Sequence, residues 1–86
     1  MEGIKAYIAA LRGPILITGS SGFVGANLYH MLARERDDVF AVVRHNKGWR
    51  LEHVKDESTV AVDLNDYAAT KNLVDTFSPQ TVLHCA

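Results

Sequence analysis

Residues 15–25 read Ile-Leu-Ile-Thr-Gly-Ser-Ser-Gly-Phe-Val-Gly and decide the fold of this 86-residue chain. The apolar run predicts a strand, the spaced glycines predict a tight turn, and the amphipathic residues 23–36 predict a helix. Gly19 allows a sharp turn, Gly22 has no Cβ to keep a diphosphate from the backbone, and Gly25 lets the helix approach the sheet closely. Free N–H groups at the helix start favour an anion. The stretch therefore predicts a dinucleotide site.

Two alternatives to a dinucleotide site can be weighed from the context of the turn. A tight strand-to-helix turn without a ligand stays open, although the readable strand and helix around the glycines favour a binding site. A nucleoside-triphosphate loop is excluded, because that loop requires a Lys-Ser or Lys-Thr pair after its second glycine, and the sequence contains neither pair.

Composition limits the class of protein. The chain is 48% hydrophobic and 22% charged with a net charge of −1, which predicts one small globular unit. Scattered Lys and Arg residues give no basis for binding nucleic acid, and no apolar run approaches the roughly 20 residues that span a membrane. A single cysteine, Cys85, excludes an intrachain disulfide and fits a cytoplasmic protein. No spacing of the four histidines indicates a metal site.

The N-terminal residues 1–13 are predicted to form a helical extension. Ile4, Tyr7, Ile8 and Leu11 share one helical face, and a Gly-Pro pair follows them. This helix either covers an exposed face of the sheet or frays as a chain end; both alternatives stay open.

The remaining pattern of apolar residues predicts a parallel sheet. Strands are expected at residues 14–18, 39–43, 58–62 and 81–85, helices at 23–36 and 65–77, and a short helix at 49–55. The alternation indicates an α/β Rossmann-like sheet of about four strands in the order 3-2-1-4, with flanking helices. Residues 14–86 would form one partial dinucleotide-binding domain.

Spacing also predicts which helical residues face inward. For the first long helix these are Val24, Leu28, Met31 and Leu32. For the second they are Tyr67, Leu73, Val74 and Phe77, with Asn65 or Asp63 as the N-cap.

The chain resembles the extended short-chain dehydrogenase/reductase family, whose members include NAD(P)-dependent sugar-nucleotide epimerases and dehydratases. The resemblance rests on the glycine turn at residues 18–25, on Asp63-Leu64 after the third strand, and on Val-Leu-His-Cys-Ala at residues 82–86. It covers residues 14–86, which correspond to the first part of a family member, so the fold is expected to be truncated relative to the family.

The resemblance implies a site. In the family the glycine turn holds the cofactor diphosphate, the aspartate after the third strand contacts the adenine, and the end of the fourth strand lines the ribose beside the nicotinamide. The residues implied for cofactor binding are Gly19, Ser21, Gly22, Phe23, Val24, Gly25, Asp63, Leu64, Cys85 and Ala86.

Arg44 bears on the choice of cofactor. It follows the second strand about twenty residues beyond the turn, where a carboxylate would select a free ribose 2′-hydroxyl and an arginine accommodates a 2′-phosphate. We therefore expect NADP in preference to NAD. The alternative is that Arg44 is a solvated loop cation like its neighbours His45, Lys47 and Arg50.

No catalytic residue is predicted within this chain. The family uses a Tyr-x-x-x-Lys pair placed well after the fourth strand. Tyr67 and Lys71 have this spacing, but they fall in the helix between strands three and four, where residues four apart are ordinary neighbours. The resemblance thus implies the cofactor-binding part of an epimerase, dehydratase or reductase. The alternative is a self-standing dinucleotide-binding or interaction module without chemistry. An exposed sheet edge or face would favour self-association.

Overall fold

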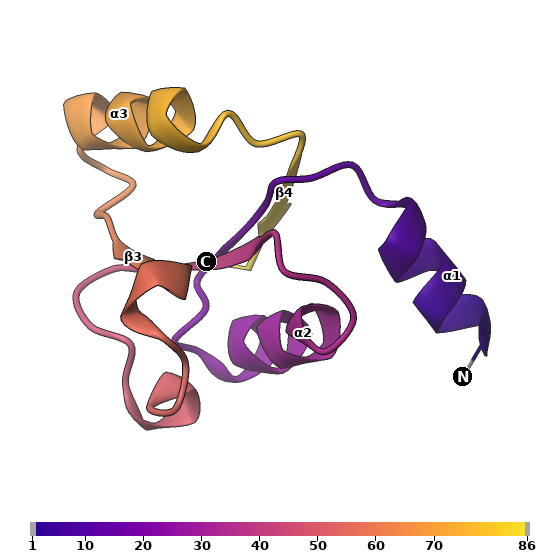
Figure 1. Ribbon diagram of the computed structural model, residues 1–86. Helices are drawn as coiled ribbons and strands as arrows, with labels where there is room; N and C mark the ends of the chain where they lie inside the picture. Colours follow the sequence, from indigo (N-terminus) through magenta and orange to yellow (C-terminus); the bar gives the residue numbers. More distant parts are fainter. Residues whose placement is uncertain (1, 86) are drawn as a thin grey trace.

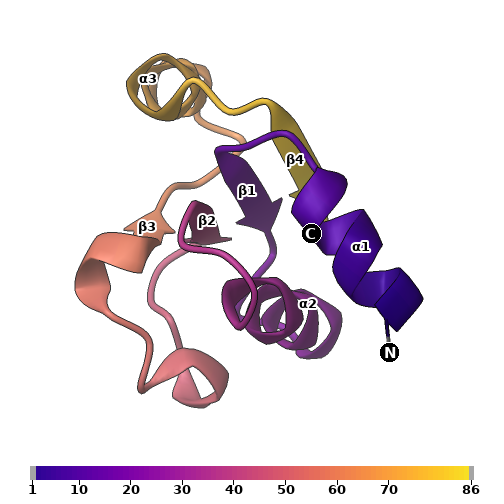
Figure 2. The same cartoon turned by 45° about the vertical axis from the view of Figure 1, so that its right-hand side comes forward.

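The computed structural model describes residues 2–85 and contains a four-stranded parallel sheet between two helices. Figure 1 and Figure 2 show α2 on one face of the sheet, α3 on the opposite face, and α1 beside β4 at one edge. The helices are α1 (Glu2–Ala10), α2 (Phe23–Ala33) and α3 (Tyr67–Phe77), and the strands are β1 (Ile15–Thr18), β2 (Val39–Val43), β3 (Thr59–Ala61) and β4 (Thr81–His84). Two short 3₁₀ turns, Trp49–Leu51 and Asp56–Ser58, connect β2 to β3.

The strand order β3-β2-β1-β4 confirms the order predicted from the sequence. β1 pairs in parallel with β2, where Ile15 is opposite Val39, and with β4, where Ile15 is opposite Thr81. All four residues of β1 are buried, because a central strand covered on both faces has no side exposed to solvent. The carboxyl ends of all four strands therefore meet along one edge of the sheet.

The two faces of the sheet carry cores of different size. The larger core lies under α2, and the smaller core lies under α3, where Leu73 packs with Leu16 and Val42 and the rings of Phe40 and Phe77 lie 4.9 Å apart. The buried members of the larger core are Ile8, Ile15, Ile17, Ala26, Tyr29, Leu32, Val39, Ala41, Val43 and Leu51. The cover on the α3 side is incomplete, since Val82 on β4 is 52% exposed.

The inward face predicted for α2 was partly wrong: Leu32 is buried and Leu28 packs against the larger core as predicted, but Val24 and Met31 do not face inward. Val24 is 65% and Met31 41% exposed, whereas Gly25, Ala26, Tyr29 and Leu32 are buried. The cause is the contact at Gly25: a Cβ there would lie 2.7 Å from the carbonyl carbon of Gly19. This approach turns the Gly25 face of the helix toward the sheet, and Val24 and Met31 consequently face solvent.

The prediction for α3 was also partly wrong. Leu73 is buried and Phe77 is half-buried, but Tyr67 is 79% and Val74 46% exposed. Leu73 and Phe77 define a stripe four residues apart that meets the sheet, and neither Tyr67 nor Val74 lies on it. The N-cap is Asp66, whose carboxylate accepts a hydrogen bond from the Ala69 N–H at 3.1 Å, and not Asn65 or Asp63.

The N-terminal helix α1 is joined to the sheet domain through Arg36. Ile8 is buried in the larger core, while Tyr7 is 79% exposed. The Arg36 guanidinium donates hydrogen bonds of 2.6 Å to the carbonyl oxygens of Ile8 and Leu11. Its other nitrogens donate to both carboxylate oxygens of Asp38, at 2.6 and 2.8 Å. Since backbone carbonyls at a helix C-terminus lack partners in the helix, Arg36 caps α1 as it fixes the helix in place.

Within residues 2–85, no helix has the length and apolar character needed to cross a membrane.

Candidate functional site

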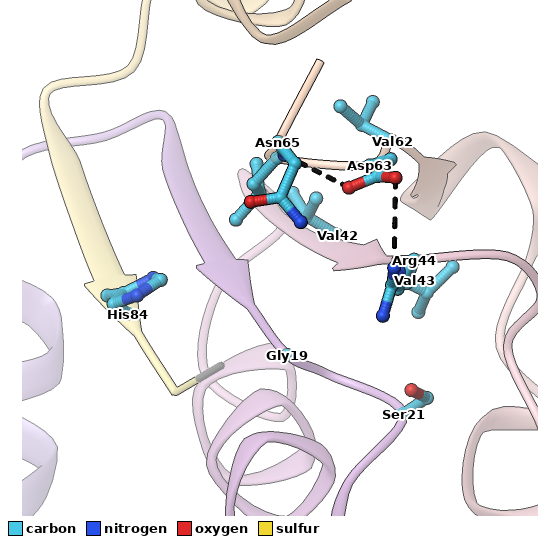
Figure 3. Close-up of a pocket in the computed structure, with 10 residues that line it drawn as sticks. Gly19, Ser21, Val42, Val43, Arg44, Val62, Asp63, Asn65 and His84 are labelled. Atoms are coloured by element: carbon cyan, nitrogen blue, oxygen red, sulfur yellow. Dashed lines mark hydrogen bonds and ion pairs between the residues drawn. The ribbon is translucent and has the colours of Figure 1, made fainter. Parts of the chain in front are cut away.

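A cavity of about 340 Å³ lies at the carboxyl edge of the sheet. This volume is near the lower end of the range for small-molecule sites, about 300–1,000 Å³. Figure 3 shows its lining, which comes from the ends of all four strands. The lining residues are Gly19, Ser21, Val42, Val43, Arg44, Val62, Asp63, Leu64, Asn65 and His84. The strand order reverses between β1 and β4, so the cavity lies where open α/β sheets bind their ligands.

The glycine turn forms one wall of this cavity. Gly19 has φ 66°, a left-handed conformation that favours glycine, and its carbonyl accepts a hydrogen bond from the Gly22 N–H at 3.2 Å. Ser20 is fully buried, and its hydroxyl donates to the Ile17 carbonyl at 2.5 Å. These bonds hold the turn from inside, so that Ser21 and Gly22 form its outer surface.

The start of α2 presents bare backbone at this turn. Gly22 is the N-cap residue and supplies no side-chain cap to the helix. It is exposed, and a Cβ at Gly22 would meet only the Gly19 carbonyl oxygen, at an ordinary 3.5 Å. The first N–H groups of a helix lack acceptors within the helix and carry the positive end of its dipole. The arrangement can therefore accept an anion directly on the backbone.

Asp63 and Arg44 face each other across the cavity mouth. One Asp63 carboxylate oxygen accepts the Asn65 N–H at 3.0 Å, and the other lies 3.9 Å from Arg44 Nη2 (Figure 3). The Arg44 side chain is 66% exposed and that of Asp63 41%. A pair this open contributes little to stability, so the guanidinium is free to exchange the carboxylate for another anion.

His84 lies on the opposite side of the cavity and is held by Thr18. The Thr18 hydroxyl oxygen lies 2.6 Å from His84 Nδ1 and accepts the Cys85 N–H at 3.2 Å. Thr18 is buried, and this hydrogen bond gives its hydroxyl a partner on β4.

The structure brings together five of the eleven residues predicted for the site. Gly19, Ser21, Arg44, Asp63 and Leu64 line the cavity. Five others are not among the lining residues: Gly22, Phe23 and Val24 are exposed at the start of α2, Gly25 is buried against Gly19, and Cys85 is half-buried beside the larger core. Ala86 falls outside the described residues.

Sequence reasoning missed several lining residues. His84 was interpreted as a surface or strand residue; it is an exposed residue of β4 that also lines the cavity. Val43 and Asn65 were not predicted as site residues. Their positions at or just beyond the carboxyl ends of predicted parallel strands were the available signal, since such ends converge at one edge. Tyr67 and Lys71 are not among the lining residues, and Lys71 instead pairs with Asp75 at 2.8 Å.

No group of three or more His, Cys, Asp or Glu side chains within residues 2–85 is arranged to hold a metal ion.

Comparison with known proteins identifies the family of this chain. Residues 15–86 match the model of the NAD dependent epimerase/dehydratase family. UDP-glucuronate 4-epimerase from Thermodesulfobacterium geofontis (strain OPF15) is 30% identical over an alignment of 84 residues, which covers 86% of this chain and 26% of that protein. The chain thus spans about a quarter of the length of this curated relative. No solved structure matches the chain significantly. The match along nearly the whole chain and the observed strand order agree: the protein belongs to the NAD dependent epimerase/dehydratase family, which implies a nicotinamide dinucleotide cofactor.

Proposed function

We propose that this chain is the cofactor-binding portion of a family member and that it holds NADP in preference to NAD. The observation that carries the proposal is the turn at Gly22, where exposed backbone at the start of α2 faces solvent beside the cavity. A diphosphate requires such an approach, because any side chain at this position would occupy its place. The residues present therefore fit a dinucleotide.

The predicted residues are assigned to parts of the cofactor as the family resemblance implies. The turn and the start of α2 would hold the diphosphate, and Asp63 with Leu64 would contact the adenine from the end of β3. The family resemblance implies that Cys85 and Ala86 would line the ribose beside the nicotinamide, and His84 of β4 also lines the cavity. The chemistry that such a cofactor supplies is reversible hydride transfer.

The preference for NADP depends on Arg44. Arg44 directly follows β2 and lines the cavity, at the position where a residue meets the adenosine ribose. Within residues 2–85, Asp63 is the only carboxylate within 4.0 Å of the guanidinium, at 3.9 Å. A guanidinium binds a phosphate through two parallel hydrogen bonds, and this interaction is stronger than the loose ion pair between Arg44 and Asp63. Arg44 as a purely solvated cation is the competing interpretation.

The activity of a complete protein is a further part of the proposal. The relative named UDP-glucuronate 4-epimerase supports action on a sugar nucleotide by an epimerase, dehydratase or reductase. We assign no catalytic residue within this chain, because Tyr67 and Lys71 lie on α3 and do not line the cavity. Family membership favours this interpretation over a self-standing binding module. We also propose self-association of the chain, because β4 is an edge strand and its Val82 side chain is half-exposed on one face of the sheet. The location that we propose is cytoplasmic.

Titration of the purified chain with NADPH and NADH tests the proposal. We expect NADPH to raise the melting temperature more than NADH at equal concentration, since a ligand at a hundred times its Kd adds about 2.7 kcal/mol to stability. Absence of a shift with either, in a sample shown by circular dichroism to be folded, would contradict cofactor binding. A larger shift with NADH would contradict only the role given to Arg44.

A further inference from the structure

Arg50 lies beside the glycine turn, and both its backbone and its guanidinium have contacts there. Its backbone carbonyl accepts a hydrogen bond from His30 Nε2 of α2 at 2.9 Å, so the residue is tied to the helix next to the turn. The guanidinium carbon lies 4.5 Å from the centre of the Trp49 ring and 6.0 Å from that of Phe23. Nη1 lies 3.5 Å from the Ser21 carbonyl oxygen, at the long end of hydrogen-bond distances. The cation is thus held against the outer side of the turn.

Arg50 has no carboxylate within 4.0 Å among residues 2–85. Two aromatic faces position its guanidinium, and a cation in this setting keeps its charge and most of its donors available. By contrast, the guanidinium nitrogens of Arg36 already donate hydrogen bonds to Asp38 and to the Ile8 carbonyl of α1. A preorganised and unneutralised guanidinium next to an anion-binding turn is placed to receive a phosphate.

Ser21 connects Arg50 with the cavity. It lines the cavity together with Arg44, while its carbonyl oxygen faces Arg50. Figure 3 shows the Ser21 hydroxyl on the side of Arg44. The free N–H groups of α2 suit the diphosphate, and the end of β2 marks the place of the adenosine ribose. A phosphate on that ribose would lie between the end of β2 and Ser21.

We propose that Arg50 is a second arginine of the 2′-phosphate site and acts with Arg44 and Ser21 to select NADP over NAD. This inference rests on the proposed function. Arg44 follows β2 and lines the cavity with Ser21, and Arg50, in the 3₁₀ turn Trp49–Leu51, reaches the Ser21 carbonyl. Trp49, the only tryptophan of the chain, lies 4.5 Å from the guanidinium carbon, so its fluorescence would report a phosphate bound at Arg50.

Calorimetric titration of the chain with NADPH and NADH, for the wild type, Arg50→Gln, Arg50→Lys and Arg34→Gln, tests the inference. Arg34→Gln is the charge-matched control, because Arg34 is an exposed residue at the C-terminus of α2, away from the turn. We expect Arg50→Gln to weaken NADPH binding about tenfold or more, the range of one hydrogen bond to a charged group, and NADH binding less than about twofold. Arg50→Lys keeps the charge but lacks the planar guanidinium, so its NADPH affinity should lie between those of the wild type and Arg50→Gln. Arg34→Gln should leave the affinities for both cofactors unchanged.

The possible results separate this inference from the proposed function. Unchanged NADPH affinity in Arg50→Gln, or equal losses for both cofactors, overturns the role of Arg50 while cofactor binding stands. Binding of neither cofactor by the folded wild type overturns both proposals. Should Arg50→Gln fail to fold, Arg50→Lys decides: a selective loss for NADPH supports the role, and wild-type affinity overturns it.

Discussion

Gly25 on α2 packs directly against the backbone of Gly19 in the turn, and a methyl group at Gly25 would overlap the Gly19 carbonyl. This one contact sets the rotation of α2, the depth at which its first turn lies on the sheet, and the exposure of Gly22 at the site. The three glycines of the turn therefore have separate roles, which substitutions can distinguish.

Gly25→Ala is expected to destabilise the fold. The added Cβ would lie 2.7 Å from the Gly19 carbonyl carbon and 2.9 Å from the Ser20 Cα, and rigid backbone cannot yield as a flexible side chain does. Overpacking of this kind costs about 1–3 kcal/mol in the free energy of unfolding, measured by urea denaturation. Gly22→Ala is the matched control and should cost less than about 1 kcal/mol, because its Cβ meets only one atom at 3.5 Å. Equal losses in both variants would refute the separate role of Gly25.

Gly22→Val should abolish cofactor binding while the fold persists. Gly22 has φ −82° and ψ 173°, an extended conformation that valine adopts readily, and the added side chain would project into solvent at the turn. We expect NADPH and NADH affinities to fall at least about tenfold, and the far-ultraviolet circular dichroism spectrum to be unchanged. Gly3→Ala on α1, where a new methyl meets nothing within 4 Å, serves as the control and should bind normally. Normal binding by Gly22→Val would show that the diphosphate lies elsewhere.

Thr18→Val tests the link between β1 and β4. The substitution keeps the shape of the buried side chain but removes the partner of His84 Nδ1 and one acceptor of the Cys85 N–H. That N–H retains the Thr18 carbonyl at 3.2 Å, so the expected loss is only about 1 kcal/mol in the free energy of unfolding. Thr76→Val, at an exposed position on α3, should change stability by less than about 0.5 kcal/mol. A loss in the control as large as that in Thr18→Val would argue against the link.

The attachment of α1 should depend on pH. The hydrogen bonds from Arg36 lower the pKa of Asp38 below its ordinary 3.8, because they favour the ionised carboxylate. The stabilisation by this pair is therefore fully present above pH 3.8 and is lost as the pH falls through the lowered pKa. Urea midpoints of the wild type and Asp38→Asn should differ at pH 7 and converge as the acid range is entered.

Asp37→Asn controls for this test, because Asp37 is the exposed neighbour of Asp38. Its urea midpoint should follow that of the wild type at every pH. Hydrogen exchange of the α1 amides locates the effect: protection in α1 should fall in Asp38→Asn more than protection in β1. A uniform loss across the chain would contradict a local attachment.

Much of the architecture could be predicted because it depends on local signals. β2 has the bounds predicted from its apolar run, and the strand order agrees with the prediction. The other strand predictions included a flanking residue at one or both ends, and α2 ends at Ala33 where residues up to 36 were expected. Helix ends depend on tertiary partners: Arg36, predicted as the last helical residue, binds α1 and Asp38 instead.

The candidate site was predictable where motif and backbone geometry coincide, and less so elsewhere. Gly19 and Ser21 belong to a turn whose conformation is predicted by the spacing of its glycines. Arg44 and Asp63 directly follow the ends of predicted strands. The approach of Arg50 to Ser21 could not be read from the sequence. The two residues are far apart along the chain, and their contact depends on the path of the loop and on the bond from His30.

The sequence by itself determined the strand–turn–helix unit at residues 15–25, the parallel sheet and the expectation of a dinucleotide. These follow from short-range rules, namely hydrophobic period, glycine conformation and the direction of crossovers. Only the tertiary structure decided which face of α2 is buried, that His84 lines the cavity, and that Arg36 bonds to Ile8 whereas Arg50 lies against Trp49. The physical reason is that burial, side-chain partners and free charge are properties of what packs against a residue, and those neighbours are distant in the chain.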